Sequence, residues 1–203
     1  MGSSEPRVRR GYFECRYGQL HVHNAIPPGG GFEEGTPLLC LHPAGVTGRF
    51  FQKFLPVAGR DRSVYAPDLP GSGESDAPAQ RISAGDLSAA LGDFLESMRF
   101  RQIDVLGYHS GALVAIELAI SRPQQVKRVA LVGVPDVARD RVSLMTAQTA
   151  MVLRPRDDLW ESTQRIRDRL PRARFVDLPD HGPTLFETGA DAVANALKDF
   201  LRG

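Results

Sequence analysis

The sequence predicts an α/β protein whose sheet is mostly parallel and doubly wound, with helices on both faces. Three observations support this fold class. Short apolar runs of strand length alternate with segments whose apolar residues have helical spacing. Several of the strand-like runs are apolar throughout, which is typical of parallel strands buried on both faces. Polar residues that can do chemistry follow several of these runs, at the carboxyl ends where such folds gather their sites.

Length and composition limit the classes of protein to which the chain could belong. It has 203 residues, of which 42% are hydrophobic and 24% charged, as expected for one soluble globular domain. The net charge of +1 predicts no affinity for nucleic acid or for an anionic membrane. There is no membrane-length apolar run and no secretory signal, so we expect a cytoplasmic protein. Cys15 and Cys40 are expected to be reduced core residues.

We expect a single domain at residues 11–203, preceded by a disordered tail at residues 1–10. The tail begins Met-Gly-Ser-Ser, which resembles the start of an expression vector sequence. Residues 11–26 alternate apolar and polar side chains around a glycine, and this pattern predicts an N-terminal antiparallel hairpin. The sequence PPGGG at residues 27–31 predicts a loop after the hairpin.

The other elements are predicted from apolar periodicity and from turn residues. Strands are expected at residues 37–41, 63–66, 103–106, 126–132, 150–153 and 173–178. Helices are expected at residues 50–55, 112–120, 159–170 and 190–201, with one more that begins after Ser83 and ends near Met98. Ser83 and Asp86 have the spacing of a capping box, which marks the start of that helix.

A strand, a tight turn and a helix follow one another in the stretch QIDVLGYHSGALV. Gly107 and Gly111 lie two places before and two places after His109, as in the Gly-x-nucleophile-x-Gly turn that raises one side chain above a parallel sheet. A turn centred on Ser110 would place Tyr108 where a small residue is needed. The spacing therefore favours His109 at the apex of the turn, with the hydroxyl of Ser110 one place later.

Five segments of the chain, in the same order, resemble those of the α/β-hydrolase superfamily over nearly the full length. They are residues 41–45 (LHPAG), 67–76 (PDLPGSGESD), 107–111 (GYHSG), 157–158 (DD) and His181 before the last helix. The resemblance implies the α/β-hydrolase fold and a catalytic set in the order nucleophile, acid, histidine. In this chain that set would be His109 or Ser110, then Asp158, then His181.

The resemblance implies a role for the acid and the histidine. His181 would act as general base and then as general acid, and Asp158 would hold the imidazole in the correct tautomer. In family members the acid usually lies three residues after the turn residue that ends its strand. That residue is Pro155 here, so the spacing selects Asp158 over the adjacent Asp157. Asp136, after the preceding strand, is a weaker candidate for the acid.

The resemblance also implies an oxyanion hole. Pro43 has no N–H, so the first donor would be the backbone N–H of Ala44. The second donor would be the backbone N–H that follows the apex, which belongs to Ser110 or to Gly111 according to the register of the turn. The candidate substrate-binding residues near the strand ends are His42, Tyr108 and Pro135. Asp68 and the turn after it are expected to shape the mouth of the site.

Three functions remain open from the sequence. In the first, the turn shifts by one residue and Ser110 attacks through His181, as in a serine hydrolase. In the second, His109 faces His181 and Asp158 in a two-histidine site, which hydrolyses a small ester, an amide or a C–C bond, or instead does lyase or cofactor-free oxygenase chemistry. In the third, the protein is a pseudo-enzyme that binds a ligand.

The expected partner is a small-molecule substrate, without nucleic acid or membrane. No cofactor and no metal are expected, because the sequence holds no close-spaced ligand motif such as HExxH. The helical cap of the family would lie between residues 132 and 150, and the connection at residues 136–149 has room for only about one helix. The uncapped face, with Leu144 and Met145, would offer a surface for a homodimer.

Overall fold

The computed structural model describes residues 5–28 and 35–202. One sheet of eight strands runs through this part of the chain, in the order β1-β2-β4-β3-β5-β6-β7-β8. The strands are β1 (Val8–Cys15), β2 (Gly18–Ala25), β3 (Leu38–Leu41), β4 (Val64–Pro67), β5 (Ile103–Tyr108), β6 (Val126–Val132), β7 (Gln148–Leu153) and β8 (Arg174–Asp177). The pairs β1–β2 and β2–β4 are antiparallel, and the other pairs are parallel.

The predicted fold class is confirmed, but the predicted tail is wrong in part. β1 begins at Val8, because Val8 pairs with Ala25 and the ladder continues through Arg10 opposite His23. Residues 8–10 are therefore part of the hairpin. Residues 1–4 of the predicted tail and residues 29–31 of the predicted loop lie outside the described residues.

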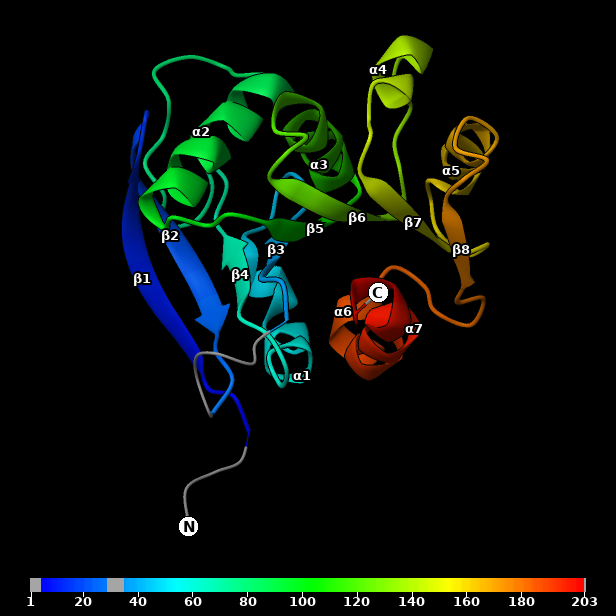
Figure 1. Cartoon of the computed structure of the whole chain (residues 1–203), viewed down its shortest axis with the longest axis horizontal. Coiled ribbons are helices and arrows are strands. Elements are labelled where there is room, and N and C mark those ends of the chain that lie inside the picture. Colours follow the sequence, from blue (N-terminus) through cyan, green and yellow to red (C-terminus); the bar gives the residue numbers. More distant parts are fainter. Residues whose placement is uncertain (1–4, 29–34, 203) are drawn as a thin grey trace.

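Helices cover both faces of the sheet, as Figure 1 shows. They are the 3₁₀ helix η1 (Gly48–Phe51) and the α-helices α1 (Phe54–Ala58), α2 (Ala84–Ser97), α3 (Ser110–Ser121), α4 (Arg139–Ser143), α5 (Trp160–Arg167), α6 (Leu185–Thr188) and α7 (Ala190–Arg202). Helices α2, α3, α4 and α5 lie on one face, and α1, α6 and α7 lie on the other (Figure 1). The helix predicted at residues 50–55 is instead divided between η1 and α1, and the short helix α6 was not predicted.

The two faces of the sheet bury separate apolar clusters. Leu91, Val105 and Leu118 belong to the cluster under α2 and α3. Phe54 and Leu197 belong to the cluster under α1 and α7. Strands whose side chains alternate between these two clusters must be apolar on both faces, which explains the continuous apolar runs in the sequence.

A buried ionic group ties the end of the chain to the centre of the sheet. Arg62 and Arg128 both donate to the carboxylate of Asp104, over 3.3 Å in each case, and both donate to the carbonyl of Leu201. Asp104 lies on β5 and Arg128 on β6, whereas Leu201 lies near the end of α7. The last helix is therefore held by hydrogen bonds as well as by apolar packing.

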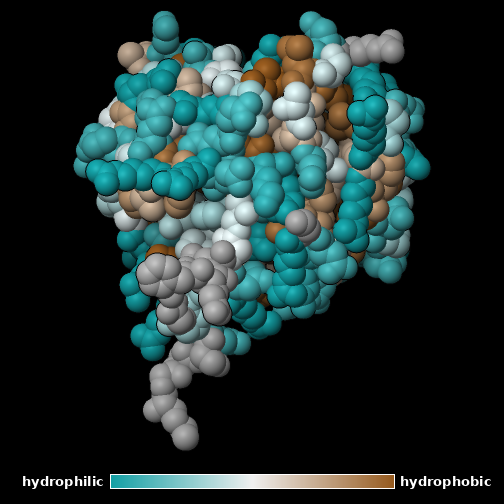
Figure 2. Space-filling model, in the orientation of Figure 1, coloured by the Kyte–Doolittle hydropathy of each residue, from teal (hydrophilic) through white to brown (hydrophobic). Residues whose placement is uncertain are grey.

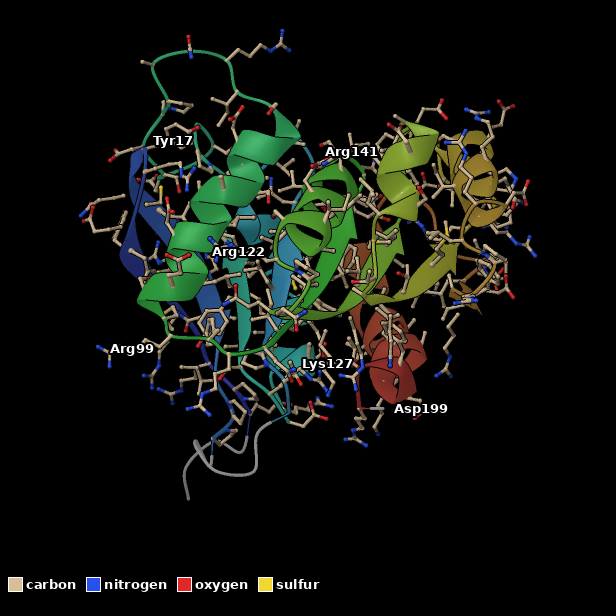
Figure 3. All side chains as sticks on the ribbon, turned by 45° about the horizontal axis from the view of Figure 1, so that its top comes forward. Tyr17, Arg99, Arg122, Lys127, Arg141 and Asp199 are labelled. Atoms are coloured by element: carbon tan, nitrogen blue, oxygen red, sulfur yellow. The ribbon has the colours of Figure 1, made fainter. Side chains whose placement is uncertain are left out.

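The connection from β6 to β7, where a cap was expected to be missing, holds the short helix α4. Arg141 of α4, labelled in Figure 3, pairs with Glu117 of α3, with 3.0 Å between Nε and Oε1. Leu144, which follows α4, is 54% exposed. Figure 2 shows hydrophobic atoms near the top of the view, in the region where Figure 1 places α3 and α4.

No helix in the described part of the chain is both long enough and apolar enough to cross a membrane.

Candidate active site

His109 lies at the turn between β5 and α3, with φ 51° and ψ −121°. Among the described residues other than glycine, only Arg99 and His109 have a positive φ. The turn is tight because Gly107 and Gly111 approach other backbone atoms. A Cβ on Gly107 would lie 2.6 Å from the carbonyl oxygen of Gly111, and a Cβ on Gly111 would overlap the carbonyl of Leu41. The strained backbone is thus at His109, and the two glycines allow it.

The imidazole of His109 faces the carboxylate of Asp157. Its Nε2 lies 3.1 Å from both carboxylate oxygens. On the other side, the ring stacks on Tyr108 with 4.1 Å between the ring centroids and an interplanar angle of 12°. Gly133 leaves the space for this pair, because a Cβ at that position would lie 2.8 Å from Nε2 of His109 and 2.9 Å from the Asp157 carboxylate.

Arg154, at the end of β7, is the residue that holds Asp157 in place. Its side chain is fully buried and pairs with the Asp157 carboxylate. It also donates to the carbonyl of Gly182 over 2.7 Å and to the hydroxyl of Tyr108 over 3.2 Å. Sequence reasoning missed this residue. The sequence signal that could have found it is an arginine directly after an apolar strand, since residues at the end of a central strand are usually buried.

The surroundings of His109 keep its imidazole neutral. Burial and then the positive charge of Arg154 lower the pKa of His109 to about 4, although Asp158 acts in the opposite direction. Asp157 is paired with a guanidinium and is an acceptor only, so Nε2 of His109 carries the proton and donates it. The lone pair is then on Nδ1, which makes no hydrogen bond to any residue that the structure describes. A neutral imidazole with a free nitrogen can accept a proton.

Ser110 is the first residue of α3, and its hydroxyl contacts the predicted oxyanion loop. The backbone N–H of Ala44 donates to Oγ of Ser110 over 2.6 Å. The two predicted oxyanion residues are thus in direct contact. The backbone N–H of Ser110, at the beginning of the helix, belongs to the set of amides that have no partner within the helix. Gly111 has a different role, because its lack of a side chain lets α3 approach the carbonyl of Leu41 at the end of β3.

The structure brings Asp157, and not the predicted Asp158, into hydrogen-bond distance of His109, and the role of Asp158 as the acid stays a prediction. Asp158 is exposed, and the carboxylate that turns inward is that of Asp157. The physical reason is Arg154, whose buried guanidinium attracts the carboxylate three residues later. Asp136, the weaker candidate, is exposed as well. It lies on the surface and pairs with Arg165 over 2.7 Å.

His181 lies in the loop before α6 and is half-buried. Its ring packs against Gly189, where a Cβ would lie 2.6 Å from Nδ1. Within the described chain, no hydrogen bond or ion pair joins His181 to His109, Asp157 or Asp158. The loop is nevertheless next to the site, because its Gly182 carbonyl accepts from Arg154. The structure therefore brings the loop into contact with Arg154, the partner of Asp157, and does not bond the histidine ring to the acid.

Two of the three candidate substrate-binding residues are corrected. His42 is fully buried, its Nδ1 donates to the carbonyl of Pro43 over 2.8 Å, and its Nε2 accepts from the N–H of Leu69 over 2.9 Å. Tyr108 is only 3% exposed, because it is covered by His109 and by Phe50. Both residues support the site rather than face a substrate. The third candidate, Pro135, is half-buried after β6, and its role stays a prediction.

A cavity of about 800 Å³ lies between η1 and α6, beside the stacked rings. Phe50 and Phe186 line it, and Phe50 stacks on Tyr108 with 5.1 Å between the centroids. Arg49 and Lys53 also line this cavity. It thus combines an apolar wall with two cationic side chains and the carboxylate of Glu187, a composition that suits a small organic ligand.

Comparison with known proteins places this geometry in a family. Residues 38–202 match the model of the alpha/beta hydrolase family. The chain is 34% identical over 104 residues to a 2-hydroxymuconate semialdehyde hydrolase of Pseudomonas sp. (strain CF600), covering 49% of this chain and 36% of that protein. It is 24% identical over 170 residues to the pyrrolizixenacetamide deacetylase of Xenorhabdus hominickii, covering 83% of this chain and 60% of that protein.

Solved structures share the fold at low sequence identity. The enol-lactonase of Burkholderia xenovorans LB400 superposes with a TM-score of 0.85 at 14% identity, covering 95% of this chain and all (100%) of that chain. A predicted CIB-like hydrolase of Thermoplasma acidophilum superposes with a TM-score of 0.85 at 15% identity, covering 97% of this chain and 99% of that one. Because the family model extends over residues 38–202, the chain belongs to the alpha/beta hydrolase family.

Proposed function

We propose that this protein hydrolyses a small organic substrate at an ester, amide or C–C bond, with a histidine that acts as general base at the position where related enzymes carry the nucleophile. The observation that carries the proposal is the strained His109, which donates to Asp157 through Nε2 and keeps Nδ1 free. Strain of this kind persists only where the surrounding structure enforces it, and it gathers at active sites.

In the proposed reaction, Nδ1 of His109 takes a proton from a water molecule as the water oxygen attacks the acyl carbon. The hydrogen bond from Nε2 to Asp157 stabilises the imidazolium that forms. The negative charge that develops on the acyl oxygen would be stabilised by the N–H groups of Ala44 and Ser110. When the tetrahedral intermediate collapses, the bond to the leaving group breaks and the proton passes from His109 to that group.

This mechanism requires one change at the site. The N–H of Ala44 now donates to Oγ of Ser110, so a substrate oxygen must displace that hydroxyl. Rotation of the Ser110 side chain would free the donor without any movement of the backbone. The cavity beside Phe50 would hold the apolar part of the substrate, and Arg49 and Lys53 would favour a substrate that carries a negative charge. The similar proteins include a semialdehyde hydrolase, a deacetylase and an enol-lactonase, and these activities are consistent with a small substrate.

The test is hydrolysis of p-nitrophenyl acetate by the wild type and by three variants. We expect His109→Gln to lower kcat/KM by about 10²- to 10⁴-fold, because it removes the group that accepts the proton. Ser110→Ala, which keeps the backbone N–H, should retain most of the activity. His181→Gln should also retain it, since His181 contacts neither His109 nor Asp157.

A fluorophosphonate probe distinguishes this route from the serine route. Covalent labelling of Ser110, together with inactivity of Ser110→Ala and His181→Gln, would show that the turn rearranges and that Ser110 is the nucleophile. We expect no labelling of Ser110. Circular dichroism of each variant controls for loss of fold.

A second candidate function is supported by the contacts of Asp157. In family members the acid holds the catalytic histidine, but here the Asp157 carboxylate contacts His109, the N–H of Leu159 and Arg154. A site without the usual relay would suit a ligand-binding scaffold, or a lyase or cofactor-free oxygenase. Absence of ester turnover, combined with ligand binding that depends on His109, would favour this second function.

A further inference from the structure

A second group of titratable side chains lies on β2 and at the end of β4, away from His109. His21 and His23 are two residues apart on β2, so both rings project from the same face of the sheet. β4 pairs with β2, and Asp68 follows β4, where its backbone N–H donates to the carbonyl of His21 over 2.9 Å. One ligand atom from each of the three side chains lies within 4.8 Å of the other two.

Both imidazoles converge on the carboxylate of Asp68. Nδ1 of His21 lies 2.9 Å from Oδ2, and Nε2 of His23 lies 3.8 Å from Oδ1. The second separation is too long for a hydrogen bond. The ring of His23 makes no hydrogen bond with any residue in the described ranges, although its side chain is only 12% exposed. The cluster thus contains a largely buried imidazole whose nitrogen points at a carboxylate without bonding to it.

These separations fit the ligands of a small divalent cation. Around a tetrahedral Zn²⁺ with bonds of about 2.1 Å, neighbouring ligand atoms lie about 3.4 Å apart. The separations from His21 to Oδ2, 2.9 Å, and from His23 to Oδ1, 3.8 Å, lie on either side of that value, and each imidazole faces its own carboxylate oxygen. Two imidazole nitrogens and one carboxylate oxygen form a donor set typical of zinc sites that keep a further position open. The partial exposure of His23 gives that position access to water.

The carboxylate is already oriented by the backbone, as metal-ligating carboxylates usually are. The N–H of Gly48 donates to Oδ1 of Asp68 over 2.7 Å, and the N–H of Glu74 donates to Oδ2 over 3.0 Å. Burial would raise the pKa of Asp68, but the bonds from Glu74, His21 and Gly48 together hold that pKa below its usual range. Burial lowers the pKa of His23.

We propose that His21, His23 and Asp68 bind Zn²⁺ and that the ion links the N-terminal hairpin to the loop after β4. The sequence concealed this site because the two parts are far apart in the chain and match no close-spaced ligand motif. Strands β4 and β3 lie between β2 and β5, so the site is separate from His109. Arg10, opposite His23 on β1, and Arg49 are cations near the cluster that reduce its affinity for a metal.

The proposal is tested on the full chain after dialysis against EDTA. Zn²⁺ is titrated by calorimetry, and Co²⁺ is followed by its visible absorption, which reports coordination by nitrogen and oxygen. We expect one ion per chain and at least 10-fold weaker binding by His23→Ala. The matched control is His181→Ala, which removes a half-buried histidine outside the cluster and should bind the ion like the wild type. The chain has five histidines, and no two of them are adjacent.

A thermal melt with and without Zn²⁺ keeps the test decisive if His23→Ala folds poorly. His23→Gln preserves the length and polarity of the side chain, and we expect Zn²⁺ to raise the Tm of the wild type but not of this variant. Absence of Zn²⁺ binding by the wild type, or equal binding by the wild type and the folded His23 variants, would overturn the proposal. Neither result depends on whether His109 is catalytic.

Discussion

At the scale of single residues, the site around His109 depends on tight packing between the imidazole and the backbone of Gly133. Gly133 has φ +59°, and a Cβ at that position would lie 2.5 Å from Cδ2 of His109. A side chain at position 133 would be strained by the positive φ, and it would overlap the imidazole of His109. The position of the imidazole therefore depends on a glycine that takes no part in the chemistry itself.

Gly133→Ala is expected to displace His109 from Asp157. We expect a loss of about 1–3 kcal/mol in the free energy of unfolding, from the left-handed backbone and the contact together, and a parallel fall in ester turnover. Urea denaturation and kcat/KM measure the two effects. Gly85→Ala is the matched control, because a Cβ there meets only the Ser83 hydroxyl, at 3.6 Å, and alanine favours the helix. An unchanged kcat/KM in folded Gly133→Ala would contradict the proposed role of His109.

The pH dependence of turnover should report the pKa of His109. Because burial and Arg154 lower that pKa to about 4, the active neutral form persists to low pH, and kcat/KM should fall only as the pH drops through about 4. Arg154→Met removes the positive charge, so the fall of kcat/KM at low pH should begin at a higher pH in this variant if it folds. A wild-type limb close to the ordinary histidine value would instead indicate that a group other than His109 is the base.

At the scale of elements, the predictions that succeeded rest on local chemistry. Ser83 and Asp86 form the predicted capping box of α2, in which the Asp86 N–H donates to Ser83 Oγ over 3.2 Å and the Ser83 N–H donates to Asp86 over 2.9 Å. β6 also has the bounds that its pattern predicted, and α7 extends one residue beyond its predicted end. The region at residues 48–58 was predicted less well, because Thr47 caps a 3₁₀ turn before α1 begins.

Ser83→Ala should destabilise the protein by about 1 kcal/mol, because it leaves an N–H group of the first turn of α2 without its partner. The change is measured as a shift of the urea midpoint at a constant m-value. Ser97→Ala, near the other end of α2, removes a hydroxyl that bonds only to the carbonyl of Phe94 and should have a smaller effect. Equal effects of the two substitutions would show that the cap contributes nothing specific.

At the scale of the whole molecule, an aromatic cluster connects segments that are far apart in the chain. Phe186 of α6 is fully buried, and its ring centroid lies 4.9 Å from that of Phe51, 5.4 Å from that of Phe54 and 5.5 Å from that of Tyr108. Tyr108 in turn supports the ring of His109. The cluster thus joins η1 and α1, β5 and the loop region that contains His181.

Phe186→Ala is expected to cost about 3–5 kcal/mol in the free energy of unfolding, because it opens a cavity in this cluster. It should also lower turnover, since Tyr108 would lose part of its support. Phe186→Leu should restore much of the stability. Leu144→Ala serves as the surface control, because Leu144 is 54% exposed, and should change the stability by less than about 0.5 kcal/mol. A small loss in the free energy of unfolding of Phe186→Ala would mean that the cluster contributes little to holding α6 against η1, α1 and β5.

The sequence by itself determined the α/β fold, the order of its elements and the turn that is centred on His109. Those features depend on periodicity, caps and glycine spacing, which act over a few neighbouring residues. Only the tertiary structure decided that Asp157, and not the adjacent Asp158, turns inward, because the buried guanidinium of Arg154 pairs with the Asp157 carboxylate. The pairing of β2 with β4 likewise brings His21 and His23 to Asp68. Such contacts join residues that are distant in sequence, and packing, rather than any local pattern, selects them.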